Sequence, residues 1–181
     1  MRVISGKLKG REIKGFDISG TRPTMDRVKQ SLFGSIQEYI EDSIVLDLFA
    51  GSGNLGIEAI SNGASKVYFN DHNKKCIRVI EDNINNFNIC EQSIITNYDY
   101  KEALNYYKNN NIKFDIVFLD PPYKEHIINE ILSFMIENEL LNNNSLVICE
   151  VNNKEEFINE RIILFKEKRY GDKKIIIYKL V

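Results

Sequence analysis

Apolar residues recur along the chain in two alternating patterns, short continuous runs and stripes of helical period. The runs predict five buried strands, at Ile44 to Phe49, Lys66 to Asn70, Ser93 to Asn97, Phe114 to Leu119 and Ser145 to Val151. The helical stripes between them predict helices that include Lys74 to Phe87 and Glu125 to Leu140. Strands and helices in repetition predict an α/β fold whose parallel sheet is covered on both faces.

Both ends of the chain depart from this alternation. The stretch "RIILFKEKRYGDKKIIIYKLV" has two strand-like runs around Tyr170, Gly171 and Asp172, which predicts an antiparallel hairpin at one edge of the sheet. Residues 1–23 alternate and are punctuated by glycine, so they predict a small hairpin extension in front of a core at 24–181. The helix that follows is expected to start with Thr24 as its cap. Its apolar stripe is expected to pack on the core and consists of Val28, Leu32, Phe33, Ile36 and Ile40.

Composition narrows the class of protein. A chain of 181 residues with 43% hydrophobic and 28% charged residues fits a single soluble domain, and no apolar run nears the roughly 20 residues that cross a bilayer. The start of the chain lacks a secretory signal pattern, so a cytoplasmic protein without a membrane partner is expected. Three scattered cysteines, Cys76, Cys90 and Cys149, predict free buried thiols and no metal site.

Charge is distributed unevenly. Residues 1–30 carry +5 and residues 165–181 carry +4, whereas the whole chain carries −2. A polyanion needs only a local positive patch, because salt screens charges within about 10 Å. The basic amino-terminal end therefore predicts a nucleic-acid contact, with solvated charge as the alternative. The expected contact residues are Lys7, Lys9, Arg11, Lys14, Arg22 and Arg27, and Lys29 is also expected to point away from the apolar stripe.

The stretch "DLFAGSGNLG" carries the first candidate chemistry. Gly51, Gly53 and Gly56 have the G-x-G-x-x-G spacing after a predicted strand, and Asp71 ends the next strand 20 residues after Gly51. Glycines there permit a tight turn and let a ligand approach the backbone N–H groups at the helix start. A nucleoside cofactor is expected.

Three carboxylates indicate which cofactor. Asp47, at the end of the strand before the glycine loop, would repel a pyrophosphate but stabilise the sulfonium and ammonium of S-adenosylmethionine. Asp71 is placed to accept hydrogen bonds from ribose hydroxyls, and Asp99 to meet the adenine amine. Phe49 and Tyr100 complete the expected cofactor site. Carboxyl ends of successive strands are where ligands bind in such sheets.

The stretch "FLDPPY" carries the second candidate chemistry. Pro121 and Pro122 cannot donate ladder hydrogen bonds, so the strand stops there and leaves Asp120 and the Pro121 carbonyl projecting. Tyr123 adds a ring on which an extruded base could stack. Acceptors on an exocyclic amine can direct its lone pair at a methyl donor. This arrangement indicates an amino-directed methyltransferase.

Five stretches together resemble the bacterial methyltransferases that modify a guanine N2 of small-subunit (16S) ribosomal RNA. They are "RVISGKLKGREIK", "TRPTMDRVKQSLF", "LDLFAGSGNLGIEA", "FLDPPY" and "YGDKK", and they span nearly the whole chain. The resemblance implies a Rossmann-like sheet of seven strands, a ribosomal RNA partner in the small subunit, and Asp120, Pro121 and Tyr123 at the target amine. It also implies a cofactor site made by Asp47, Gly51, Gly53, Asp71 and Asp99. Many methyltransferases have Glu where this chain has the shorter Asp71.

Other functions stay open on the sequence. A DNA or RNA adenine or cytosine amino-methyltransferase would use a related Pro-Pro-Tyr stretch, although duplex reading needs a further groove-binding element for which little chain is left. A non-catalytic RNA-binding assembly factor is disfavoured by Asp120 and the intact glycine loop. A dehydrogenase is disfavoured by Asp47.

Overall fold

The computed structural model describes residues 1–15, 22–122, 127–151, 157–171 and 173–181, without the side chains of residues 22–25 and 173. Its helices are α1 (Arg22–Ile36), η1 (Gln37–Tyr39), α2 (Asn54–Ser61), α3 (Lys74–Phe87), η2 (Cys90–Gln92), α4 (Tyr100–Asn109) and α5 (Ile127–Glu137). Its strands are β1 (Ile44–Asp47), β2 (Lys66–Asn70), β3 (Ser93–Thr96), β4 (Phe114–Leu119), β5 (Leu141–Val151), β6 (Ile162–Tyr170) and β7 (Lys173–Leu180).

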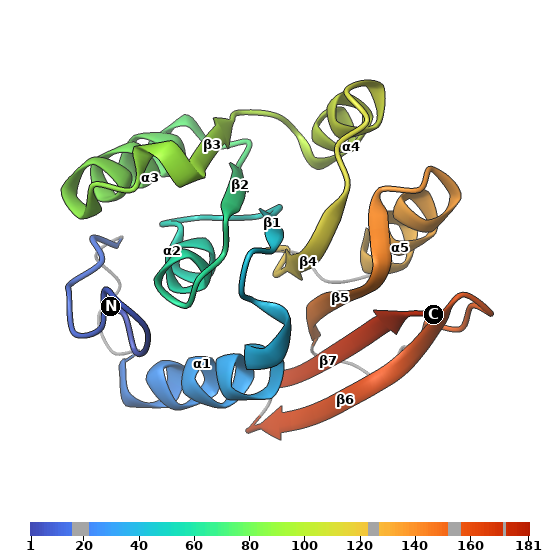
Figure 1. Cartoon of the computed structure of the whole chain (residues 1–181), viewed down its shortest axis with the longest axis horizontal. Coiled ribbons are helices and arrows are strands. Elements are labelled where there is room, and N and C mark those ends of the chain that lie inside the picture. The colour runs from blue at the N-terminus through green and yellow to red at the C-terminus, as the bar shows by residue number, and fades with distance from the viewer. Residues whose placement is uncertain (16–21, 123–126, 152–156, 172) are drawn as a thin grey trace.

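The strands form a seven-stranded sheet in the order β3-β2-β1-β4-β5-β7-β6. Neighbours from β3 to β5 are parallel, whereas β7 is antiparallel to both β5 and β6. Helices α1, α2 and α3 cover one face of the sheet, and α4 and α5 cover the other (Figure 1). The predicted α/β fold and the carboxyl-terminal hairpin are confirmed.

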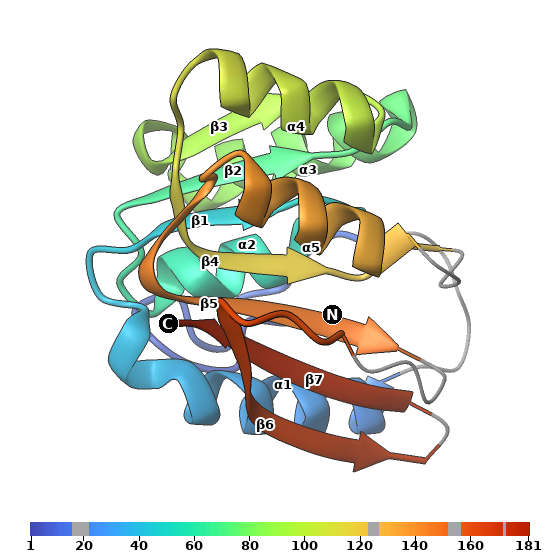
Figure 2. The same ribbon diagram turned by 90° about the vertical axis from the view of Figure 1, so that its right-hand side faces the viewer.

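The strand order creates a switch point between β1 and β4. From β1 the chain runs outward through β2 to β3, and it then returns to the other side of β1 as β4. Crossovers that leave in opposite directions open a crevice at the carboxyl ends of these two strands, which is where ligands bind in open α/β sheets. Figure 2 shows β4 and β5 ending at the same edge.

Strand β1 explains why its sequence reads as a continuous apolar run. Val45 belongs to the core cluster under α1, α2 and α3, and Leu46 belongs to the cluster under α4 and α5. Both are fully buried. A central parallel strand alternates between two covered faces, so apolar residues occupy both sides of β1 up to Asp47 at its end. The predicted core stripe of α1 is confirmed in the same way, because its residues belong to or pack against the first cluster.

Several predicted element ends were wrong. Helix α5 ends at Glu137 rather than Leu140, because Glu139 takes a left-handed φ of 54° and the Leu140 N–H bonds the Met135 carbonyl at 2.9 Å. Strand β5 begins at Leu141 rather than Ser145, through a pairing with β4 that contains a register shift. Apolar content alone does not mark either end.

Predicted bounds near the site were also too long. Strand β1 ends at Asp47 rather than Phe49, and β3 ends at Thr96 rather than Asn97. Helix α1 begins at Arg22, so Thr24 lies inside its first turn and is not its cap. Pro23 suits that turn, because the first N–H groups of a helix have no acceptor within it.

The amino-terminal segment, residues 1–15, folds back on itself with less regularity than expected. A single antiparallel bridge joins Arg2 to Glu12, supported by a 2.9 Å hydrogen bond from the Val3 N–H to the Arg11 carbonyl. Val3 and Ile13 are buried and join the core beneath α1 and α2. In the rest of the predicted extension, residues 16–21 lie outside the described residues, and Arg22 and Pro23 belong to α1. Burial of alternate apolar residues therefore attaches this segment to the domain.

The cysteines are free, as predicted, but one of them is not buried. Cys76 and Cys149 are buried, whereas Cys90 is exposed because it starts the surface turn η2 between α3 and β3. Among the described residues no helix is long and apolar enough to span a bilayer.

Candidate functional site

The glycine loop lies at the carboxyl end of β1, where the chain turns into α2. Gly51 and Gly53 have φ values of 56° and 81°, in the region that disfavours other residues, and Gly53 precedes the first residue of α2. A Cβ on Gly56 would lie 2.2 Å from the Phe69 ring, so this glycine lets α2 pack against β2. A Cβ on Gly51 would meet nothing within 4 Å. The first glycine therefore faces open space, and the third serves packing.

Asp47 lies directly beneath this loop and is almost fully buried. Its Oδ2 accepts a hydrogen bond from the Gly56 N–H at 3.1 Å. Burial raises the pKa of Asp47 to about 7, the Gly56 N–H opposes this rise, and the charges of Asp120 and Asp71 add to it. Within the described residues Asp47 has no cationic partner. A bound cation would stabilise the ionised carboxylate here.

Asp71, at the end of β2, holds the other side of the loop. Its Oδ2 accepts the Gly51 N–H at 3.0 Å and its Oδ1 accepts the Asn73 N–H at 2.9 Å. A carboxylate has about four lone-pair sites, so acceptor capacity remains for a ligand. Burial, reinforced by Asp71, raises the pKa of the neighbouring Cys76 thiol to about 11. Asp47 and Asp71 thus both meet the glycine loop, as their positions at strand ends predicted.

Asn70 is a site residue that the sequence reading missed. Its side-chain amide donates to the carbonyls of Leu48 and Tyr98, both at 3.1 Å, and its oxygen accepts from the Thr96 hydroxyl at 2.9 Å. These bonds join the loops that follow β1 and β3. A buried Asn at a strand end is a signal that could have identified it, because a buried amide requires partners.

Asp99, Phe49 and Tyr100 line the same edge. Asp99 is exposed and caps α4, with its Oδ1 accepting the Lys101 N–H at 2.9 Å. The rings of Phe49 and Tyr100 lie 6.1 Å apart at 43°, and the Tyr100 hydroxyl donates to Glu130 at 3.2 Å. Asp99 thus accepts from the N–H groups of Lys101 and Glu102 in a capping box. A carboxylate has about four lone-pair sites, so acceptor capacity remains for a ligand.

Asp120 follows β4 directly, across the switch point from Asp47. Asp47 pairs in register with Phe118, two residues before Asp120. Asp120 is exposed, Pro121 is buried and Pro122 is exposed. Tyr123 lies outside the described residues, so its stacking role stays a prediction. The structure therefore brings Asp120 and the glycine loop to one edge of the sheet.

The predicted RNA-contact residues divide into two groups, according to whether a contact within the protein already holds the charged side chain. Lys7, Lys9 and Arg27 are exposed. Arg11 stacks its guanidinium 4.5 Å from the centre of the Phe87 ring and donates to the Asn86 carbonyl, while Lys14 lies 3.4 Å from Asp82. The side chain of Arg22 lies outside the described residues. Arg11 thus caps the end of α3 as well as carrying charge.

Lys29 contradicts the expectation that it points away from the core. It is only 4% exposed and forms an ion pair of 2.8 Å with Glu58, which is fully buried. Glu58 also accepts from the N–H groups of Ile4 and Ser5. Burial lowers the pKa of Lys29 and Glu58 opposes this. A charged residue inside the apolar run of α2 was the sequence signal for this pair.

Two buried side chains connect the amino-terminal segment to the glycine loop. Lys29 donates to the Arg2 carbonyl at 2.7 Å and to Asn54 Oδ1 at 2.8 Å, at the first residue of α2. Asn83 of α3 accepts the Lys14 N–H at 2.9 Å and donates to the Ser52 carbonyl at 3.0 Å. The segment and the loop therefore share their supports.

Comparison with known proteins places the chain in a family. The sequence model of the family described as Conserved hypothetical protein 95 matches residues 1–179. The chain is 36% identical to "Ribosomal RNA small subunit methyltransferase D" of Haemophilus influenzae, with 99% of this chain and 92% of that protein covered. It is 35% identical to "Putative rRNA methyltransferase YlbH" of Bacillus subtilis, with 99% and 98% covered.

A solved structure agrees over the same length. The protein titled "Putative methyltransferase yhhF from Escherichia coli" superimposes with a TM-score of 0.88 at 26% identity, covering 99% of this chain and 97% of that one. Similarity of sequence and fold thus extends over 99% of the chain. The chain belongs to the Conserved hypothetical protein 95 family and is a homologue of the bacterial proteins named ribosomal RNA small subunit methyltransferase D.

Proposed function

We propose that this protein transfers a methyl group from S-adenosylmethionine to the exocyclic N2 amine of a guanine in small-subunit ribosomal RNA. The observation that carries the proposal is the meeting of Asp47, Asp71 and the glycine loop with Asp120 across the switch point of the sheet. The names of the homologues support ribosomal RNA as the substrate. The resemblance noted on the sequence supports the guanine N2 position.

The described residues fit S-adenosylmethionine. Asp47 is a carboxylate whose pKa is raised by burial, and the cofactor carries two cationic groups that would stabilise its ionised form. Gly51 faces open space, which allows close approach to the loop. Asp71 keeps acceptor capacity for ribose hydroxyls, and we expect Asp99 and the Phe49–Tyr100 pair to hold the adenine.

Asp120 and the Pro121 carbonyl are proposed to hold the target amine. Bound S-adenosylmethionine supplies an electrophilic methyl group on sulfur. The amine nitrogen of guanine is a poor nucleophile, because its lone pair is delocalised into the base. Hydrogen bonds from both N–H groups to fixed acceptors favour a pyramidal nitrogen and orient its lone pair. Asp120 also offsets the positive charge that develops on the nitrogen during transfer.

The base must leave its stack before these acceptors can reach it. N2 lies on the Watson–Crick edge, so a paired guanine would have to be flipped out, whereas an unpaired one in a loop is accessible. Tyr123, outside the described residues, is proposed to stack on the extruded base. The expected partner is ribosomal RNA in an assembling or assembled small subunit.

Nucleoside mass spectrometry after a transfer assay tests the proposal. Small subunits from a strain lacking the protein, their naked RNA, and DNA are each incubated with the wild-type protein and labelled methyl donor. We expect one N2-methylguanosine in small-subunit RNA. Asp120→Ala should bind the donor normally and lose most transfer, at least 100-fold in single turnover. Glu91→Ala, which removes an exposed carboxylate in η2, is the matched control.

Two outcomes would contradict the proposal. A methylated adenosine or cytidine, or labelled DNA, would replace the guanine N2 assignment with another amino-methyltransferase activity. Transfer by Asp120→Ala at the wild-type rate would remove Asp120 from the reaction.

A further inference from the structure

Gly34 occupies a position in α1 that nothing in the described part of the chain requires to be glycine. Glycine is among the least favourable residues within a helix, and it is usually tolerated for a left-handed φ or for close packing. Gly34 is exposed and its φ is not in the left-handed region. A Cβ added to it would meet no atom within 4 Å. The missing side chain therefore leaves space outside the protein's own packing.

That space belongs to a cavity of about 540 Å³ between α1, the amino-terminal segment and the carboxyl end of α2. Its volume lies within the range of about 300–1,000 Å³ typical of ligand pockets. Gln30 of α1 and Gln37, the first residue of η1, line the cavity on either side of Gly34, four residues before it and three after it. Their exposed amides can both donate and accept hydrogen bonds.

The opposite wall of the cavity is held by Ser61 at the end of α2. The Lys7 N–H donates to the Ser61 carbonyl at 2.8 Å and the Leu8 N–H to the Ser61 hydroxyl at 2.9 Å. A Cβ on Gly6 would lie 1.9 Å from the Ser61 carbonyl oxygen, so the segment can follow this path only with glycine there. The cavity is therefore formed before any ligand binds.

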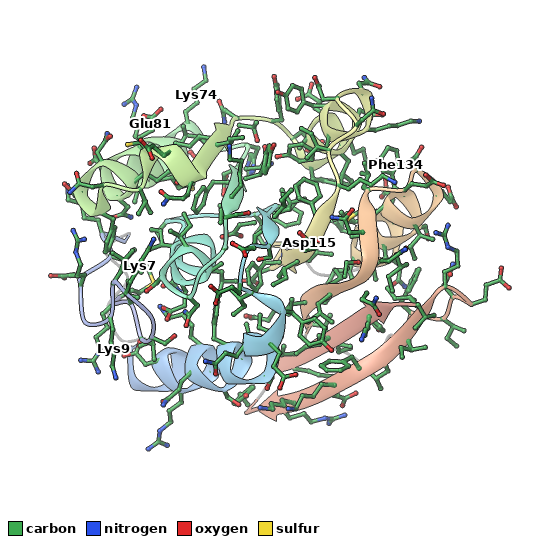
Figure 3. The ribbon with its side chains drawn as sticks, viewed as in Figure 1. Lys7, Lys9, Lys74, Glu81, Asp115 and Phe134 are labelled. Atoms are coloured by element: carbon green, nitrogen blue, oxygen red, sulfur yellow. The ribbon has the colours of Figure 1, made fainter. Side chains whose placement is uncertain are left out.

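The charges at the cavity favour an anion. Lys7 and Lys9 line it and are exposed, and neither has an ion-pair partner within the described residues. Figure 3 shows both on the amino-terminal segment beside α1 and α2. The charge of the nearby buried Glu58 is matched by Lys29 at 2.8 Å, so it does not oppose an anion.

We propose that this cavity binds a nucleotide of the ribosomal RNA other than the target guanine. Its phosphate would lie at Lys7 and Lys9, and its base would lie over Gly34 between the Gln30 and Gln37 amides. The eight residues of α2 separate the cavity from the glycine loop, about 12 Å along the helix. The site is therefore distinct from the methyl-transfer site. The proposal rests on RNA being the substrate and adds a second, remote point of recognition.

Filling the cavity tests the proposal. Gly34→Leu adds a side chain whose Cβ would meet no atom within 4 Å, and it replaces glycine by a better helix former. We expect the unfolding midpoint to rise by about 1–3 °C, the affinity for S-adenosylmethionine to be unchanged, and the affinity for small-subunit RNA to fall about 10-fold. Gln30→Ala combined with Gln37→Ala should weaken RNA binding by a similar factor.

A matched control tests whether an exposed leucine by itself changes RNA affinity. Asn105→Leu adds the same side chain at an exposed position of α4, on the other face of the sheet, and should leave RNA affinity unchanged. Gly34→Ala, a smaller change, should give a smaller loss than Gly34→Leu. This graded response would not arise from a role in folding, because both substitutions favour the helix.

The binding assay separates this proposal from the proposed function. Wild-type RNA affinity in folded Gly34→Leu would overturn the cavity assignment while methyl transfer to guanine still stood. Loss of affinity in Gly34→Leu would support the cavity even if the methylated position proved to be a different one. If the wild-type protein binds neither naked small-subunit RNA nor small subunits, both proposals fail.

Discussion

Asp47, Asn70 and Asp71 show how single side chains build this edge of the sheet. Asp47 and Asn70 are the last residues of β1 and β2, and Asp71 directly follows β2. Each side chain forms a hydrogen bond with the backbone of the glycine loop or of a neighbouring loop. A buried carboxylate or amide without such partners would destabilise the fold. The same groups therefore shape the loop and present acceptors to a cofactor.

The raised pKa of Asp47 predicts a pH-dependent stability. In the folded protein the pKa is about 7, against an ordinary value of 3.8. The folded state therefore keeps a proton that the unfolded chain releases, and this contribution is present below about pH 4 and is lost as the pH rises to 7. Asp47→Asn stays neutral and keeps an acceptor for the Gly56 N–H. Relative to this variant, the wild-type free energy of unfolding should fall by on the order of 3–4 kcal/mol over that range.

Urea unfolding of both proteins at several pH values measures this difference. Curves that stay parallel from pH 4 to pH 7 would show that Asp47 does not titrate there. Donor binding gives an independent check, because a cationic donor favours the ionised carboxylate. Near pH 7 binding should release protons, and the calorimetric heat should vary with the ionisation enthalpy of the buffer.

Gly51 predicts a substitution that separates folding from cofactor binding. Asn tolerates left-handed φ better than other residues, and the space around Gly51 is open within the protein. Gly51→Asn should therefore fold with a loss of no more than about 1 kcal/mol. If the cofactor occupies that space, its affinity should fall at least 10-fold in calorimetry.

Gly171 provides the matched control for this substitution. It lies in the turn between β6 and β7, has a φ of 58° and also has nothing within 4 Å of an added Cβ. Gly171→Asn should bind the donor as the wild type does. Equal affinities for the Gly51 and Gly171 variants would contradict cofactor approach at the loop.

At the scale of elements, the amino-terminal segment is a support of the glycine loop as well as a basic extension. It reaches the loop through Lys29 and through Asn83, both buried. Three elements distant in sequence, α1, α2 and α3, contribute to these contacts. Substitution of Lys29 or Asn83 should therefore change the conformation or stability of the glycine loop.

Lys29→Met is expected to weaken donor binding as well as stability. It removes three polar contacts and leaves Glu58 as an unpaired buried charge, which typically costs about 3–5 kcal/mol. Donor affinity should fall several-fold under conditions where the variant is folded. Lys29→Met combined with Glu58→Gln should recover part of the stability and none of the contact with Asn54.

Lys168→Met is the control. Its ammonium makes three hydrogen bonds to Ser31 and Ser35 of α1 from strand β6, away from the glycine loop. This substitution should reduce stability and leave donor affinity unchanged. An equal loss of donor affinity in both variants would mean that α1 acts on the site only through general stability.

At the scale of the whole molecule, the two basic ends lie apart from the acidic glycine-loop edge. The amino-terminal segment packs beside α2 and α3, whereas β6 and β7 lie at the far side of the sheet against α1 (Figures 1 and 2). RNA that reaches the target site can therefore contact the amino-terminal segment along α2. Attraction of this kind depends on salt.

The salt dependence of RNA binding should distinguish the two groups of basic residues. Lys7→Gln with Lys9→Gln should lower the slope of log affinity against log salt by roughly 1.4–1.8, which is two phosphate contacts. Arg11→Gln with Lys14→Gln should lower it less, because Arg11 is held on Phe87 and Lys14 faces Asp82. Filter binding at several salt concentrations measures both. A larger effect of the second pair would reverse this assignment.

The bounds of β2, β4 and α3 could be predicted because local patterns define them. Each is a run or stripe of apolar residues with polar residues at its ends, and burial on both faces of the sheet gives that pattern directly. The end of α5 could not be predicted, because a left-handed Glu139 stops it without a glycine. The early start of β5 depends on pairing with β4 across a register shift, which no local pattern records.

Candidate site residues show the same division. Two patterns indicated the site: the spacing of Gly51, Gly53 and Asp71, and the Asp-Pro-Pro-Tyr stretch. Each could be recognised because glycine turns and strand ends leave a pattern in the local sequence. Asn83 and Glu58 were missed because their partners lie between 29 and 69 residues away. The sequence shows that these residues are polar and lie within apolar stripes, but it does not show their hydrogen-bond partners.

The sequence by itself determined the alternation of strands and helices, the glycine turn and the carboxylates at strand ends, since periodicity and backbone restriction act over a few residues. Only the tertiary structure decided which strand ends meet, which lysines stay available to a ligand and which are held inside, and where an exposed helix glycine opens a cavity. Those outcomes depend on contacts between distant segments, and burial sets the energy of each charge there.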